Sequence, residues 1–112
     1  MKKNEELNLK FYKKDSFGEK RSLIDSNNAT DINKGLHFID ILNDIVITDL
    51  IDNITLIQNN MDYDKSFLEN AEEFTVFNMT FIKPFFSIGG YQTIHMNDLK
   101  ILLEEWLEFK NS

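Results

Sequence analysis

Hydrophobic and polar positions alternate over residues 7–12. Leu7, Leu9 and Phe11 each precede a polar or amphipathic neighbour, the pattern of a half-buried strand. Residues 16–19 have the composition of a turn, and a short second strand is expected near residues 22–24. Residues 25–31 are polar and rich in turn formers, which predicts a surface loop.

The pattern between residues 36 and 58 is ambiguous. Residues 36–41 fit a strand, and the β-branched composition favours extending it to about Ile47. Further on, apolar residues recur at helical spacing, with Thr48 as a candidate N-cap. These positions are Ile47, Leu50, Ile51, Ile54 and Ile57. We predict a strand through Ile47 and leave residues 48–58 open.

The next segments predict a loop, a strand, a turn and another strand. Residues 59–64 are loop-like, whereas residues 73–82 are so apolar that we expect a central strand covered on both faces. Pro84 should end its pairing, because proline donates no backbone hydrogen bond. Residues 89–90 are a glycine pair that predicts a turn, and residues 91–96 fit a short strand.

The C-terminal segment predicts an amphipathic helix. Asn97 is a candidate N-cap, and Asp98 stands where a helix N-terminus favours negative charge. One face is apolar and the other is charged. The apolar positions are Leu99, Leu102, Leu103, Trp106 and Leu107. The predicted fold is α+β, a single small domain spanning residues 1–112, with an antiparallel or mixed sheet on which this helix packs.

Composition fits one folded domain. The chain has 112 residues, and 42% are hydrophobic, including ten Phe. It has no cysteine, which excludes disulfides, thiolate nucleophiles and cysteine zinc sites. The start has no apolar signal-like stretch, and no run approaches the roughly 18 apolar residues that cross a membrane. We therefore expect a cytoplasmic protein without a cofactor.

The net charge of −7 is unevenly distributed. Residues 1–21 hold seven basic residues and four acids, whereas residues 22–112 hold five and fifteen. Between residues 35 and 82, Lys65 is the only basic residue beside nine acids. Such a field attracts a basic protein and repels nucleic acid and anionic lipid. We interpret the lysine-rich start as a solvated edge strand and not as an RNA site.

Two histidines raise the question of catalysis or metal binding. His37 and His95 each begin a His-x-x-Asp pattern, to Asp40 and to Asp98. A carboxylate orients a histidine that acts as a general base or metal ligand. Neither pattern is accompanied by a nucleophile motif or a third ligand at fixed spacing, so we predict no catalytic site and no metal site.

Residues 62–73 approach the pattern of a calcium-binding loop. Positions one, three, five and twelve are the oxygen-bearing residues Asp62, Asp64, Ser66 and Glu73. The sharp turn at position six needs glycine, and Phe67 stands there instead. We therefore interpret the segment as a solvated acidic loop.

What remains is an acidic surface. If the carboxylates of residues 40–72 share a face, they form an anionic patch that can hold a cationic partner. Its candidate residues are Asp40, Asp44, Asp49, Asp52, Asp62, Asp64, Glu69 and Glu72, with Tyr63 and Tyr91 as aromatic anchors. The alternative is that acids are spread around the whole fold and serve solubility.

The C-terminal third resembles immunity proteins of bacterial polymorphic toxin systems, of the contact-dependent growth inhibition and Maf type. The resemblance lies in overall style and in residues 88–100 (IGGYQTIHMNDLK), which run into LLEEWL at residues 102–107. It covers about a fifth of the chain, and no site residue is carried over from it. It implies a cytosolic protein that binds a toxin domain and blocks its active site or an exosite.

Together these observations predict stoichiometric inhibition of a cognate toxin, a basic nuclease, by an acidic surface. The alternative is an accessory or chaperone-like binding module for another protein. A third possibility is a small metal-dependent enzyme built on His37 or His95. The oligomeric state is not predicted.

Overall fold

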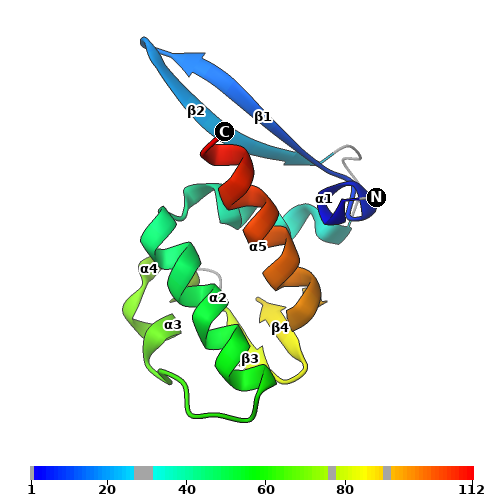
Figure 1. Ribbon diagram of the computed structural model, residues 1–112, viewed down its shortest axis with the longest axis vertical. Helices are drawn as coiled ribbons and strands as arrows, with labels where there is room; N and C mark the ends of the chain where they lie inside the picture. Colours follow the sequence, from blue (N-terminus) through cyan, green and yellow to red (C-terminus); the bar gives the residue numbers. More distant parts are fainter. Residues whose placement is uncertain (1, 27–31, 76–77, 90–91) are drawn as a thin grey trace.

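The computed structural model describes residues 2–26, 32–75, 78–89 and 92–112. They form a small α+β domain in which a two-stranded ribbon projects from a body of helices and a three-stranded sheet (Figure 1). Both sheets are antiparallel. The elements are α1 (Lys3–Glu6), β1 (Leu9–Ser16), β2 (Glu19–Ser26), the 3-10 helix η1 (Ile32–Ile41), α2 (Asp44–Gln58), α3 (Phe67–Asn70), α4 (Glu72–Thr75), β3 (Thr80–Ile82), β4 (Phe85–Ile88), β5 (Gln92–His95) and α5 (Met96–Lys110).

Helix α5 confirms the predicted C-terminal helix and its apolar stripe. The stripe is fully buried at Leu99, Leu102, Leu103 and Trp106. The predicted N-cap was wrong by two residues, because helix α5 begins at Met96 and His95 caps it. The Nδ1 atom of His95 accepts a hydrogen bond from the backbone N–H of Asn97 at 3.1 Å.

Helix α2 replaces the strand that we predicted through Ile47. Asn43, and not Thr48, is its N-cap, and its side-chain oxygen accepts from the N–H of Val46 at 2.9 Å. The helical spacing is the correct signal, since Ile47, Leu50, Asn53, Ile54 and Ile57 are the buried residues of α2. The β-branched side chains cost a few tenths of a kcal/mol each in a helix. Burying a continuous helical face outweighs that cost.

Residues 36–41 also proved helical and not extended. They belong to η1, in which Leu36 and Ile39 are fully buried at the three-residue spacing of a 3-10 helix.

The predicted central strand over residues 73–82 was also wrong. Residues 72–75 form α4, and among the described residues of this range only 80–82 are a strand, β3, which lies at the edge of the order β3-β4-β5. Phe74 is buried among aromatic rings, with its centroid 6.3 Å from Phe38 and 5.3 Å from Phe67. The expected cover on both faces was wrong as well, because of the described residues in this range only Phe74 and Met79 are buried and Ile82 is exposed.

Strand β4 is the central strand. Phe86, Ser87 and Ile88 are buried in it, and it pairs with β3 and β5. Pro84 lies in the turn between β3 and β4, so it ends the strand as predicted, and strand β5 confirms the last predicted strand. Of the predicted glycine turn, Gly89 is in a turn, while Gly90 and Tyr91 lie outside the described residues.

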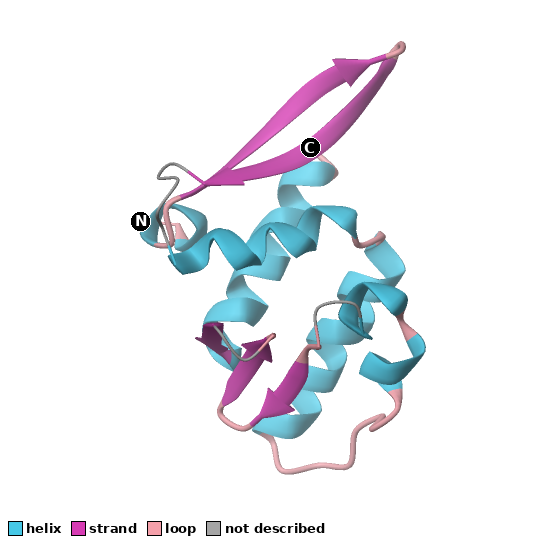
Figure 2. Cartoon of the chain, turned by 180° about the vertical axis from the view of Figure 1, so that it is seen from behind, coloured by secondary structure: helices cyan, strands magenta, loops and turns pink. Residues whose placement is uncertain are grey.

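The ribbon of β1 and β2 confirms the first two predicted strands and extends both. Leu9 pairs with Ser26 at its base and Ser16 with Glu19 at its tip. One face of its base packs on the body through Leu9, Phe11 and Ile24, while the tip extends away from it (Figure 2). Of the predicted loop, residues 25–26 belong to β2, and residues 27–31 lie outside the described residues.

The tip of the ribbon is a two-residue turn in which both central residues have positive φ. Phe17 has φ 52° and Gly18 has φ 83°, the signature of a type I′ turn. Glycine adopts this conformation freely, but in phenylalanine it causes steric strain on the order of 1 kcal/mol. Phe17 is fully exposed and gains nothing from packing in return.

Replacing Phe17 with Asn should therefore stabilise the fold. Asn-Gly is the preferred sequence of a type I′ turn. We expect Phe17→Asn to raise the free energy of unfolding by about 0.5–1 kcal/mol, measured by urea denaturation at low protein concentration. A lower stability would contradict the conformation assigned to this turn.

Candidate functional site

The outward side of α2 carries exposed carboxylates. Asp49 and Asp52 are both exposed and lie three residues apart, roughly on one side of the helix. The same helix buries its other side in the core. Because the chain has no basic residue between residues 35 and 64, nothing on α2 itself neutralises these two carboxylates.

The loop after α2 extends this acidic surface. The N–H of Asp64 donates to the side-chain oxygen of Asn53 at 3.0 Å, which fixes the loop against the side of α2 next to Asp49. Asp62 and Asp64 are exposed there. The Oδ1 atom of Asp64 accepts from the N–H of Ser66 at 3.0 Å and from its hydroxyl at 2.8 Å, so a local turn holds that carboxylate in place.

Helices α3 and α4 follow this loop along the chain and lie to one side of α2 in the view of Figure 1. Glu69 on α3 and Glu72 on α4 are exposed. We call the set of Asp49, Asp52, Asp62, Asp64, Glu69 and Glu72 the acidic face. Lys65 is the only basic residue in this part of the sequence. Six of the eight acids predicted for the patch are therefore exposed on these consecutive segments, and that they share one face stays a prediction.

Asp40 and Asp44 serve the fold instead. Asp40 is half-buried, and its carboxylate accepts from the N–H of Ile24 at 3.2 Å, which joins η1 to the ribbon. Asp44 pairs with the Nζ of Lys110 at 2.6 Å, at the place where the start of α2 meets the end of α5. The hydrogen bond from Lys110 holds the pKa of Asp44 below its ordinary value of 3.8.

Of the two tyrosines predicted as anchors, the structure describes Tyr63. The ring of Tyr63 is half-buried and packs edge-on against Phe81, with the centroids 5.6 Å apart. Tyr91 lies outside the described residues.

Sequence reasoning missed the apolar side chains that are exposed beside the acidic loop. Ile82 is 56% exposed and Phe85 is 41% exposed, and they stand directly opposite each other across β3 and β4. Met61 is 59% exposed and follows Asn60, whose side-chain oxygen accepts from Lys83 in the β3–β4 turn. The available signal was the turn at Pro84, which sets Ile82 opposite Phe85.

Of the two histidine patterns, the structure describes the side chains of the second, in which His95 and Asp98 have separate partners. His95 is committed to capping α5, and Asp98 pairs with the Nζ of Lys3 at 3.1 Å. The side chain of His37 and that of Glu73, the last position of the calcium-loop pattern, are outside what the structure describes. Among the described residues, no group of three or more histidine or carboxylate side chains is placed to hold a metal ion.

Comparisons of the chain with models of protein families, with curated proteins and with solved structures find no match. Within the described ranges, no helix is both long and apolar enough to span a membrane. Functional interpretation therefore rests on the surface chemistry of the chain itself.

The Asp44–Lys110 pair predicts a pH-dependent contribution to stability. Because the pKa of Asp44 is lowered in the folded state, the pair stabilises the fold above pH 3.8 and loses this contribution as the pH falls further. Asp44→Asn should lower the free energy of unfolding at pH 7 by less than about 1 kcal/mol, since the carboxylate is half-exposed. In urea denaturation the difference from wild type should decrease steadily as the pH falls below 3.8. A difference that does not change with pH in this range would show that the ion pair is not its cause.

Proposed function

We propose that this protein is an immunity-type inhibitor that binds a basic toxin domain through its acidic face. The observation that supports the proposal is that α2, α3, α4 and the intervening loop carry six exposed carboxylates, with a single lysine in that part of the chain. A basic nuclease holds the phosphates of its substrate in a cationic cleft. Carboxylates presented on a folded surface offer the same charges to that cleft.

The acidic face is suited to fast, specific association. Asp49 and Asp52 are presented on a rigid helix whose opposite side is core, so binding costs little backbone ordering. Clustered charges of one sign steer a partner of the opposite sign and raise its association rate. Asp64 is held by Ser66 and by the contact of its N–H with Asn53, which keeps the loop part of the face in position.

Ile82, Phe85 and Met61 supply the apolar part of the proposed interface. They lie beside the acidic loop, linked to it through the Lys83–Asn60 contact and the Tyr63–Phe81 ring contact. Exposed apolar side chains next to charges resemble the anchors of protein interfaces, which slow dissociation more than they affect association.

The runner-up is an accessory or chaperone-like module that uses the same face for a non-toxic partner. The two functions differ in their effect on a cell and in the activity of the partner. Affinity capture on the immobilised protein, followed by an activity assay of the captured domain, separates them. An immunity protein abolishes that activity at one molecule per toxin and protects a cell that expresses the toxin domain. A captured protein that keeps its activity and harms no cell would support the accessory role.

Removing two charges from α2 should slow association with the captured toxin domain. We expect Asp49→Asn/Asp52→Asn to lower the association rate constant by about 5–10-fold at low salt and to flatten its dependence on ionic strength. Stopped-flow fluorescence measures both. The control is Asp15→Asn/Glu104→Gln, which removes two exposed carboxylates from the ribbon and α5. If both double variants slow association equally, the net charge of the protein explains the effect and the acidic face has no specific role.

Truncating an apolar anchor should act on the opposite rate constant. We expect Phe85→Ala to raise the dissociation rate constant of the toxin complex by about 10-fold while changing the association rate constant by less than about 2-fold. Surface plasmon resonance resolves the two. Ile41→Gln is a matched control, because Ile41 is 54% exposed but lies at the end of η1, outside α2, β3 and β4. An unchanged dissociation rate for Phe85→Ala would remove this strand pair from the interface.

A further inference from the structure

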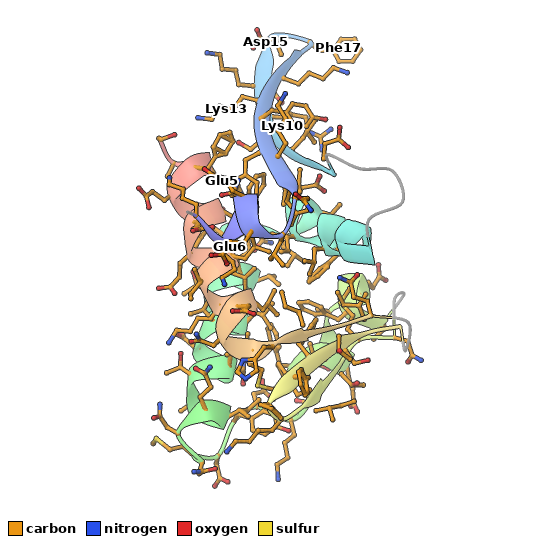
Figure 3. All side chains as sticks on the ribbon, turned by 90° about the vertical axis from the view of Figure 1, so that its right-hand side faces the viewer. Glu5, Glu6, Lys10, Lys13, Asp15 and Phe17 are labelled. Carbon is orange, nitrogen blue, oxygen red and sulfur yellow. The ribbon has the colours of Figure 1, made fainter. Side chains whose placement is uncertain are left out.

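The tip of the ribbon carries two features that folding does not require. Phe17 is fully exposed in a backbone conformation that phenylalanine adopts at a cost. Next to it, Lys14 and Arg21 stand directly opposite each other across the two strands, where like charges repel. Figure 3 shows Phe17 at the end of the ribbon, far from Glu5 and Glu6 at the level of α1.

A groove lies at the other end of the same ribbon. It has a volume of about 600 Å³ and is enclosed by the base of β1, by α1 and by the end of α5. Its apolar side is formed by Leu9, Phe11 and Phe109, of which the two rings are partly exposed. Exposed Glu5 and Glu108 stand at its rim. The groove thus offers aromatic surface beside carboxylates.

We propose that two copies of this chain form a two-fold symmetric dimer in which the ribbon tip of each copy occupies the groove at the base of the other ribbon. Phe17 would pack on the rings of Phe11 and Phe109. Lys20 and Arg21 of the tip would meet Glu5 and Glu108 of the rim. The complementarity is not of a single sign, because the tip also carries Asp15 and Glu19, and the groove is also lined by Lys2 and Lys10.

The geometry favours a second copy over contact within one molecule. The groove and the tip are separated by the length of one extended strand, roughly 25 Å, so a tip cannot reach its own groove. A second copy has the same distance between its tip and its groove, and when its ribbon runs in the opposite direction each tip lies at the groove of the other copy. Two antiparallel ribbons therefore satisfy both contacts at once, and the two-fold axis closes the assembly at a dimer. Strand β1 also pairs only with β2 in the described structure, so its other edge is available along the partner ribbon.

The dimer would leave the acidic face free. Helices α2, α3 and α4 lie on the body, away from the ribbon tip (Figure 1). The inference is thus independent of the proposed function, and a dimer would display two acidic faces.

Sedimentation velocity of the full chain tests the proposal. Two aromatic anchors and short ribbons give an interface at the small end of the usual range, so we expect a dissociation constant on the order of 10 µM. Phe17→Asn should raise it by roughly 30-fold for each contact and about 1,000-fold for the dimer, which loses two. Because Asn suits the turn, misfolding would not explain the loss. Ile45→Gln, which removes an exposed apolar side chain elsewhere, should leave the dimer intact.

A mixing experiment tests the specific pairing of tip and groove. Lys20→Glu/Arg21→Glu reverses the tip, and Glu5→Lys/Glu108→Lys reverses the rim, so each variant alone should be monomeric. Mixed together, they should form a heterodimer, because one contact is then native and the other has both signs reversed. Wild type that stays monomeric well above 10 µM, or variants whose mixture stays monomeric, would overturn the proposal.

Discussion

Burial of Trp106 joins the projecting ribbon to the rest of the molecule. The side chain comes from α5, is fully buried, and meets Phe11 of β1 edge-on with ring centroids 5.0 Å apart. Phe109 lies 5.9 Å from the same indole and 5.6 Å from Phe11, so three rings close the junction. An isolated two-stranded ribbon is only marginally stable in water, and this aromatic contact stabilises it by attaching its base to the body. The indole N–H has no acceptor among the described residues, a cost that burial of three rings outweighs.

Polar contacts from the C-terminal half of α5 have the same effect. The carboxylate of Glu105 accepts from the N–H groups of Lys3 and Asn4 at 2.9 and 3.0 Å, which satisfies two donors at the start of α1. Lys110, the last residue of α5, pairs with Asp44 of α2. One helix therefore organises the N-terminal segment, the ribbon and α2, and it leaves the outward side of α2 unconstrained. The acidic face is available because the core is complete without it.

The sequence predicted secondary structure correctly where a hydrophobic pattern fitted only one kind of element. The stripe on α5 and the alternation at Leu9 and Phe11 were interpreted correctly because both burial and spacing pointed to the same element. Residues 44–58 were harder, since β-branched side chains favour a strand while their spacing favours a helix. Packing against α5 decides between them, and that packing is not visible in the local sequence. Phe74 shows the same limit, because the neighbouring rings of Phe38 and Phe67, and not a sheet, pack against it.

The candidate site was predictable only in part for a similar reason. Charge counts located the acidic segment, but they could not separate Asp44, which Lys110 engages from 66 residues away, from Asp49, which faces solvent. Tyr63 was likewise indistinguishable from an exposed aromatic until Phe81 was placed beside it. Phe17 is the reverse case. The sequence indicated a turn at this position. Only the structure, through the positive φ and the full exposure of the side chain, shows that phenylalanine is unfavourable there. A side chain that costs stability and buries nothing in the monomer implies a contact outside the monomer, which is the strongest reason to seek the function of the ribbon in an assembly.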